Sequence, residues 1–260
     1  MITVIQNICQ AIGAHFMAFF AAIGRLVAFA VRAIRDIILP PYYPKLLLKQ
    51  IVNIGFYSLT VVGLTALFSG MVLALQSYTG FSRFNAESAI ANVVALSITR
   101  ELAPVLAGLM VAGRIGASIA AEIATMRVTE QIDAMKTLSV NPFHYLIAPR
   151  VLAGFLMLPC LVFIADIIGI FGGYLVSVYV LDFNGLSYIR QTIEFLTFID
   201  VFSGLVKAAV FGLIITLMGC YHGYYSSGGA QGVGQATTNA VVSSSIMILI
   251  FNYILTQVFF

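Results

Sequence analysis

Five stretches of this sequence are each long and apolar enough to cross a lipid bilayer, and this constrains the fold more than any other feature. The hydrocarbon core of a bilayer is about 30 Å thick and is crossed by about 20 helical residues. Hydrophobic residues make up 61% of the chain and charged residues 9%, whereas a soluble domain carries roughly 25% charged residues. We therefore predict an all-α integral membrane protein, with transmembrane helices at about 51–77, 89–125, 150–181, 201–221 and 237–259.

Residues 1–44 are also apolar, but they differ from these stretches. They contain Arg25, Arg32 and Arg35, and they end in the run LPPYYP, whose prolines must end any helix. Two interpretations are open, a sixth spanning helix or a helix that lies in the membrane interface with its basic edge toward lipid head groups. The charges favour the second. We expect an N-terminal interfacial helix and linker over 1–44, and the five-helix transmembrane domain over 45–260.

The positions of Lys and Arg in the connections predict the orientation. The segment before the first span and the 126–150 connection are rich in basic residues, whereas the 182–200 connection contains Asp182, Glu194 and Asp200 against Arg190. Because basic connections stay on the cytoplasmic side, we expect a cytoplasmic N-terminus and a C-terminus outside. The Gly/Ser-rich stretch 222–236 is then expected to be a flexible cytoplasmic loop.

The second span contains two adjacent opposite charges, Arg100 and Glu101, followed by Pro104. Neighbours on a helix point about 100° apart and do not face each other, so each side chain needs another partner. Pro104 lacks an N–H and leaves the carbonyl of Arg100 without its helical donor. Two interpretations remain, a pair buried against other helices or a polar site on a transport path. The second is favoured.

Small residues recur at every fourth position further along this span, at Gly108, Ala112, Gly116, Ala120 and Ala124. Such a stripe lets another helix approach closely in lipid. That helix could belong to the same subunit or to a second copy, and the sequence leaves both open.

Arg114, in the same span, is expected to lie near the middle of the membrane. By helical rise it lies about 20 Å from Arg127, and Asp166 on the third span lies about 24 Å from Arg150. Since the two spans are antiparallel, we predict that Arg114 and Asp166 form a structural ion pair.

The connection between the second and third spans predicts a short helix at about 128–138. Thr129 is expected to be its N-cap, with Glu130, Gln131 and Asp133 in the first turn and Met135 on an apolar side. A solvated linker and a helix that docks into a partner are both possible, and docking is favoured. The sequence has no phosphate-binding loop, so any ATP that drives this protein is bound by another chain. The scattered Cys and His residues predict no metal site.

The run RELAPVLAGLMVAGRIGASIAAEIATMRVTEQIDAM, at 100–135, resembles the MlaE family. Members of this family are the membrane permeases of ABC-type phospholipid transporters in double-membraned bacteria. The resemblance is densest over 88–155, extends loosely from residue 45 to the C-terminus, and does not include Asp166.

The resemblance implies a homodimer of five spans and an N-terminal interfacial helix in the bacterial inner membrane. It implies a cytoplasmic ATPase that engages the 128–138 segment as a coupling helix, a hexameric ring of MCE-domain subunits outside, and room for a small cytoplasmic STAS-type subunit. It also implies a lipid cavity at the dimer centre, near Arg100 and Glu101. The candidate lining residues are Leu73, Gln76, Tyr78 and Phe81.

From the residues and the resemblance together we expect a non-enzymatic permease that moves phospholipid between the inner membrane and a periplasmic MCE channel. Such a permease maintains the lipid asymmetry of the outer membrane, and it has no cofactor and no nucleic-acid partner. The alternative is a secondary transporter coupled to protons through Glu101, although that class favours inverted repeats, which the sequence lacks.

Overall fold

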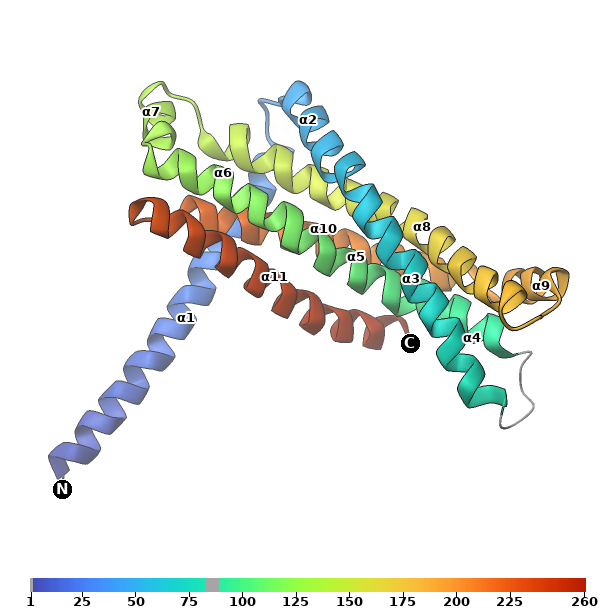
Figure 1. Cartoon of the computed structure of the whole chain (residues 1–260). Coiled ribbons are helices and arrows are strands. Elements are labelled where there is room, and N and C mark those ends of the chain that lie inside the picture. Colours follow the sequence, from blue (N-terminus) through green and yellow to red (C-terminus); the bar gives the residue numbers. More distant parts are fainter. Residues whose placement is uncertain (1, 83–88) are drawn as a thin grey trace.

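The computed structural model describes residues 2–82 and 89–260, and in these residues the chain is helical throughout, without strands (Figure 1). Three of the helical segments, labelled η, are π-helical turns inserted into longer helices. The elements are α1 (Ile2–Ile38), α2 (Pro44–Ile54), α3 (Phe56–Phe81), α4 (Ala89–Ser97), η2 (Ile98–Leu102), α5 (Ala103–Val111), η3 (Ala112–Gly116), α6 (Ala117–Val128), α7 (Gln131–Thr137), η4 (Phe143–Ile147), α8 (Ala148–Tyr179), α9 (Gly185–Phe195), α10 (Phe198–Tyr224) and α11 (Gly229–Phe259).

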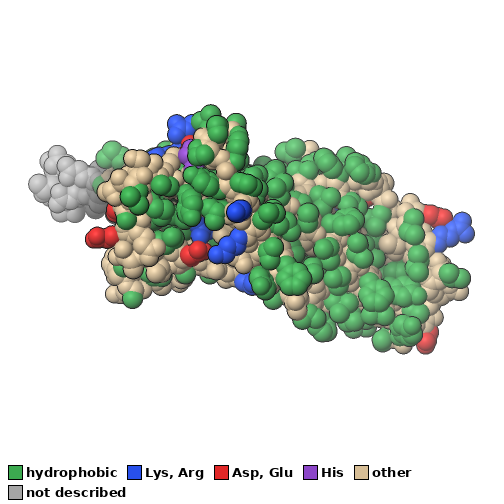
Figure 2. Space-filling view, turned by 90° about the horizontal axis from the view of Figure 1, so that it is seen from above, with side chains coloured by type: hydrophobic (Ala, Val, Ile, Leu, Met, Phe, Trp, Pro, Cys, Tyr) green, Lys and Arg blue, Asp and Glu red, His purple; other side chains and the backbone are tan. Residues whose placement is uncertain are grey.

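The prediction of an all-α membrane protein is confirmed. Each of the five expected spans is a helix, or a run of helices, that is long and apolar enough to cross a membrane, and the second span is the composite Ala89–Val128. Among the described residues the same criteria also admit a sixth segment, Phe16–Ile38 in α1. Figure 2 shows the apolar surface that results, with most of the charged side chains toward the two ends of the molecule.

Helix α1 leaves the bundle at an angle, and its N-terminal part lies far from the other helices (Figure 1). Its C-terminal half is anchored through buried Phe29 and Ala33. Phe29 packs against the ring of Phe143, with ring centroids 5.1 Å apart, and against Tyr221 and Tyr224 of α10. An interfacial position for this segment stays a prediction, because its length also suits a span.

The bundle is held together by close helix crossings at glycines. At the crossing of α3 with α8, a Cβ added to Gly70 would lie 1.9 Å from the carbonyl oxygen of Gly169. At the crossing of α8 with α10, a Cβ added to Gly212 would lie 2.1 Å from the carbonyl oxygen of Gly154. These contacts follow the rule that helices in lipid associate through small residues.

The small-residue stripe of the second span packs inside the subunit. Gly108 faces Phe211 of α10 and Ile248 of α11, and Gly116 faces Ile215 of α10. Ala112, Ala120 and Ala124 are fully buried. This face is therefore occupied by the chain's own helices and is not free to form a seam with a second copy.

Two connections differ from expectation. Helix α11 already begins at Gly229, so most of the stretch expected to be a flexible loop is helical, and Gly228 (φ 93°) and Gly229 (φ 66°) supply the left-handed turn that starts it. The 182–200 connection contains an unexpected helix, α9. Asn184 caps it by accepting hydrogen bonds from the backbone N–H groups of Leu186 and Ser187.

The α3–α8 crossing generates a prediction for stability. Gly70→Val places side-chain atoms where the backbone of Gly169 lies, and a backbone cannot yield as a side chain does. We expect a loss of about 3 kcal/mol, the upper end of the usual range for overpacking, measured as a lower thermal unfolding midpoint in detergent. Gly80→Val is the matched control, because a Cβ there meets nothing within 4 Å. Equal midpoints for the two variants would contradict this account of the crossing.

Candidate functional site

The second span is interrupted just before Pro104. The turn Ile98–Leu102 is π-helical and contains both Arg100 and Glu101. Pro104 has no N–H to donate to the carbonyl of Arg100, and the ammonium of Lys207, on α10, donates to that carbonyl instead, at 2.9 Å. A side chain from another helix therefore replaces the missing backbone donor.

Lys207 is fully buried, and all three of its ammonium hydrogens have acceptors. Besides the Arg100 carbonyl, the Nζ atom donates to Glu101 Oε1 at 2.7 Å and to Thr256 Oγ1 at 2.8 Å. A buried ammonium is costly unless it is both paired and hydrogen-bonded. This geometry meets both conditions and joins the second span to α10 and α11.

Glu101 is held by residues of two other helices. Its Oε1 accepts from Lys207 and lies 3.0 Å from the Thr256 hydroxyl, and its Oε2 accepts from the amide of Asn252 at 2.8 Å. Even so, 39% of the Glu101 side chain is exposed. The carboxylate is fixed on one side and accessible on the other.

Arg100 pairs with Asp200 at the start of α10. Its Nε donates to Asp200 Oδ1 at 2.7 Å, and its guanidinium lies 3.8 Å from the ring centre of Phe260. Asp200 also caps α10, since its Oδ2 accepts from the backbone N–H and the hydroxyl of Thr197. The Asp200 side chain is 2% exposed and that of Arg100 29%. The expectation that Arg100 and Glu101 each find a separate partner is confirmed.

We call these six residues the Lys207 cluster: Arg100, Glu101, Asp200, Lys207, Asn252 and Thr256. It contains two cations and two carboxylates. One cation, Arg100, and one carboxylate, Glu101, are partly exposed within a spanning segment. A charge in contact with hydrocarbon costs roughly 2.5–3.5 kcal/mol on insertion scales. The exposed side of the cluster is therefore suited to water or a polar group rather than to acyl chains.

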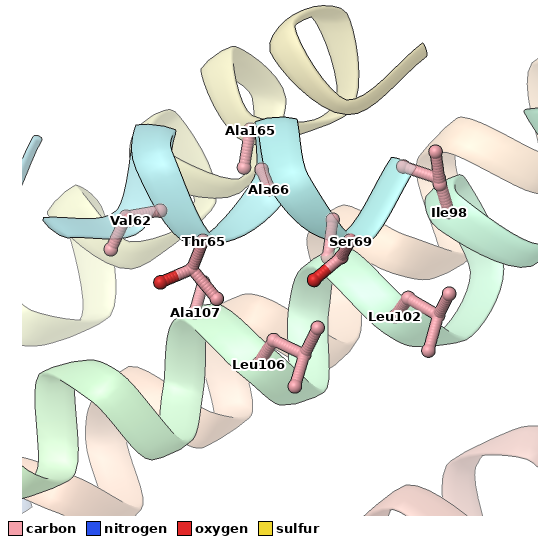
Figure 3. Close-up of a pocket in the computed structure, with 10 residues that line it drawn as sticks. Val62, Thr65, Ala66, Ser69, Ile98, Leu102, Leu106, Ala107 and Ala165 are labelled. Atoms are coloured by element: carbon pink, nitrogen blue, oxygen red, sulfur yellow. The ribbon is translucent and has the colours of Figure 1, made fainter. Parts of the chain in front are cut away.

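An apolar groove is lined in part by Ile98 and Leu102, which belong to the same π-helical turn as Arg100 and Glu101. It runs between α3 and the second span and has a volume of about 260 Å³, its open mouth included. Figure 3 shows Thr65 and Ser69 of α3 and Leu102 and Leu106 of the second span among the side chains that line it. The groove and the cluster thus share the turn Ile98–Leu102 of the second span.

The four predicted lining residues lie further along α3. Leu73, Tyr78 and Phe81 are partly buried against the core, and Gln76 is exposed. Tyr78 packs edge-on against Phe183, with ring centroids 6.0 Å apart. Within one subunit these contacts lead to the α8–α9 connection and not to the Lys207 cluster, so the role of the four residues as cavity lining stays a prediction.

The predicted pair of Arg114 and Asp166 is wrong. Arg114 donates to Ser58 Oγ at 2.7 Å, and its guanidinium lies 6.0 Å from the ring of Tyr57. Asp166 is 4% exposed, and neither carboxylate oxygen has a hydrogen-bond partner within the described ranges. Helical rise gave the depth of the two residues, but it said nothing about the direction in which each side chain points around its helix.

The short helix predicted between the second and third spans is present as α7, but Thr129 does not cap it, and its role in coupling stays a prediction. The Thr129 hydroxyl donates to the Thr125 carbonyl and so belongs to the end of α6, while Glu130, in the left-handed region (φ 60°), precedes α7 without a side-chain cap. Ile132 is buried and Met135 partly buried, whereas Gln131 and Asp133 are exposed. The polar face of α7 is thus free for a partner.

Asp133 anchors α7 to α6. It accepts from Lys136 at 2.9 Å and from Arg127 at 2.8 Å. These hydrogen bonds hold the pKa of Asp133 below its usual value, and the bond to Asp133 raises the pKa of Lys136. The pair of Arg127 and Asp133, which joins α6 to α7, is therefore charged at neutral pH. As the pH falls, this pair is lost when the pH passes through the lowered pKa of Asp133.

Sequence reasoning missed four of the six residues in the Lys207 cluster. Lys207 is the single charged residue in the predicted span 201–221. A charge inside a span indicates a functional role, so Lys207 could have been identified from the sequence. Asp200 was placed in an outer loop, although it caps α10. Asn252 and Thr256 are polar residues one helical turn apart in α11, and they belong to no recognisable sequence motif.

The sequence that forms this broken second span and its connecting helix matches a known family. The family model described as Permease MlaE matches residues 47–258. The chain belongs to the MlaE permease family. It is therefore a multi-pass membrane protein of a family of ABC transporter permease subunits.

Individual relatives agree with this assignment. The chain is 61% identical over 254 residues to a probable ABC transporter permease protein of Rickettsia felis, with 98% of each chain covered. It is 36% identical over 263 residues to the intermembrane phospholipid transport system permease protein MlaE of Haemophilus influenzae, again with 98% of each covered. It is also 39% identical over 213 residues to the chloroplast protein TRIGALACTOSYLDIACYLGLYCEROL 1 of Arabidopsis thaliana, covering 82% of this chain and 61% of that one.

The buried ammonium of this MlaE-family chain gives a second prediction. Lys207→Met leaves the Arg100 carbonyl without a donor and removes the cationic partner of Glu101, whose carboxylate keeps only the neutral donors Asn252 and Thr256. We expect a loss of about 3 kcal/mol, the low end for breaking a buried pair, because Glu101 is partly exposed. The measurement is the unfolding midpoint of the purified protein.

Adding Glu101→Gln to Lys207→Met should recover part of that loss, because the uncompensated carboxylate is gone. If the two substitutions simply add, the ion pair is not the interaction that stabilises this region.

Proposed function

We propose that this chain is the permease of an ABC-type phospholipid transporter, working as a homodimer with a cytoplasmic ATPase and a periplasmic MCE-domain ring. The Lys207 cluster is where the phospholipid head group binds. Transport through this permease would maintain the lipid asymmetry of the outer membrane. The chain needs no cofactor of its own in this scheme, because ATP is bound by the partner subunit.

The observation that carries this proposal is the half-exposed charge of the Lys207 cluster within a spanning segment. Arg100 presents a guanidinium, which forms strong charge-assisted hydrogen bonds to phosphate. Glu101 presents a carboxylate that suits the ammonium of a zwitterionic head group. The apolar groove lined in part by Leu102 provides a surface for an acyl chain. Together these features match an amphiphile with a charged head and an apolar tail.

A single subunit contributes only part of such a site. Only about 10 Å³ of the groove can hold the centre of a water molecule, far less than a typical ligand pocket offers, and Arg100 and Glu101 are open on one side. A second copy placed against this side would close the cavity and exclude bulk lipid. The proposed homodimer therefore completes the site, with Leu73, Gln76, Tyr78 and Phe81 as candidates for its outer wall.

Names and orientation support the same assignment. The relative from Haemophilus influenzae is named as a phospholipid transport permease. The distribution of basic residues favours a cytoplasmic α7, where its exposed face would meet the ATPase, and a C-terminus at the periplasmic side near Arg100. The name of the Rickettsia felis relative, a probable ABC transporter permease protein, supports this proposal over a proton-coupled secondary transporter.

The head-group assignment is tested by Arg100→Gln, which removes the guanidinium but retains a hydrogen-bond donor. We expect lipid transport by the reconstituted complex to fall about tenfold, the factor for one charge-assisted hydrogen bond. Arg190→Gln on α9 is the control, since Arg190 is 80% exposed and, among the residues that the structure describes, pairs only with Glu194 in its own helix. If the Arg100→Gln and Arg190→Gln variants both transport lipid at the wild-type rate, the role of Arg100 is purely structural.

The coupling role of α7 is tested by Asp133→Lys. This change reverses an exposed charge and breaks the anchoring contacts to Arg127 and Lys136, while buried Ile132 is untouched. We expect the permease alone to keep its unfolding midpoint, while the complex loses most of its lipid-stimulated ATP hydrolysis. Glu194→Lys on α9 is the matched charge reversal at the other end of the molecule. Full ATPase stimulation in Asp133→Lys would contradict the assignment.

A further inference from the structure

A second pocket lies at the opposite end of the bundle from the Lys207 cluster, where α1 ends and α2 and α8 begin. Its volume is about 570 Å³, its open mouth included. Two features of its lining matter here, an apolar wall formed by Leu47 and Leu152 and a polar end formed by Asp36 and His144. Tyr42 and Tyr43 of the linker complete the mouth.

Asp36 is a buried carboxylate that can accept more hydrogen bonds than it does within the described residues. Its side chain is 1% exposed. Oδ1 accepts from Arg35 Nε at 3.1 Å, and Oδ2 accepts from the amide of Asn141 at 3.1 Å. A carboxylate offers about four acceptor positions, so these two bonds leave room for further donors. Its cationic partner, Arg35, has a side chain that is 61% exposed and is therefore largely shared with water.

His144 adds a second polar group with an unmet requirement. Its Nε2 lies 3.7 Å from Asp36 Oδ2, and its Nδ1 is buried without a hydrogen-bond partner among the residues that the structure describes. A buried polar atom without a partner costs free energy, and a bound polar group in the pocket would remove that cost.

The position of the pocket indicates what can reach it. Two spanning segments begin here, one at Pro44 with α2 and one at Phe143, just before α8, and α2 and α7 lie at the same end of the bundle (Figure 1). The mouth therefore opens at the level of lipid head groups, in the leaflet on the α7 side. An occupant with an apolar part against Leu47 and Leu152 and a cationic part at Asp36 fits both ends of the pocket.

We propose that this pocket binds a phospholipid with a primary-amine head group, of the phosphatidylethanolamine class, from the leaflet on the α7 side. The ammonium donates to Asp36 and lies against the tyrosine rings at the mouth, where cation–π attraction adds to the fit. The start of an acyl chain lies along Leu47 and Leu152. A quaternary choline group cannot donate hydrogen bonds and binds more weakly, and the anionic phosphatidylglycerol head group is repelled by Asp36.

The test is native mass spectrometry of the purified full chain in detergent, with phosphatidylethanolamine and phosphatidylglycerol of identical acyl chains added in turn. We expect the wild type to retain phosphatidylethanolamine about tenfold better, as one charge-assisted hydrogen bond provides. Asp36→Asn should abolish this preference. Asp182→Asn, an acid-to-amide change at an exposed site outside the pocket, should keep it.

A second variant is needed because Asp36→Asn could lose the preference through a general loss of structure. Leu152→Trp fills the apolar end and leaves Asp36 intact, and it should also abolish the preference. A wild type without any preference, or a preference that survives both Asp36→Asn and Leu152→Trp, would overturn the proposal. If Arg100→Gln abolishes the preference and the pocket variants do not, the lipid binds at the Lys207 cluster. That result would refute this pocket and leave the proposed function intact.

Discussion

The buried ammonium of Lys207 is the interaction on which the membrane domain depends. It replaces the backbone donor that Pro104 removes, neutralises Glu101, and reaches Thr256 on α11. The break in the second span is thereby compensated by a different helix. Because this one group binds acceptors on two other elements, α10 cannot move relative to the second span or α11 without leaving a charge unpaired. The same contact links the π-helical turn at Ile98–Leu102 to both α10 and α11.

This constraint also explains how charged residues can remain partly exposed inside a membrane. Asp200 and Lys207 are buried and fixed, one by the N-terminal cap of α10 and the other by three acceptors. They hold Arg100 and Glu101 in place from behind, so the outer faces of those two side chains are available. The site is rigid before any ligand arrives, and such preorganisation reduces the entropy lost on binding. Glycine crossings such as that of Gly70 with Gly169 provide the closely packed scaffold around it.

Much of the fold could be predicted from the sequence, because hydropathy and length determine membrane spans almost directly. The separate partners of Arg100 and Glu101 also followed from helical geometry. What failed were statements that need the direction of a side chain around its helix or the exact end of a helix. Arg114 and Asp166 match in depth but do not pair, and Thr129 belongs to α6 rather than to α7. Asn252 and Thr256 join the site only because α11 packs beside the second span, and no local pattern reports that contact.

The central claim is that the exposed side of the Lys207 cluster holds a phospholipid head group. Photo-crosslinking from position 252 in cells with phosphate-labelled lipid tests it most directly, because Asn252 lies on α11 within hydrogen-bond distance of Glu101. The account predicts a labelled phospholipid adduct that is strongly reduced when Arg100→Gln is added. If no adduct forms, or if the adduct is unaffected by Arg100→Gln and so reflects surrounding bulk lipid, the claim is contradicted.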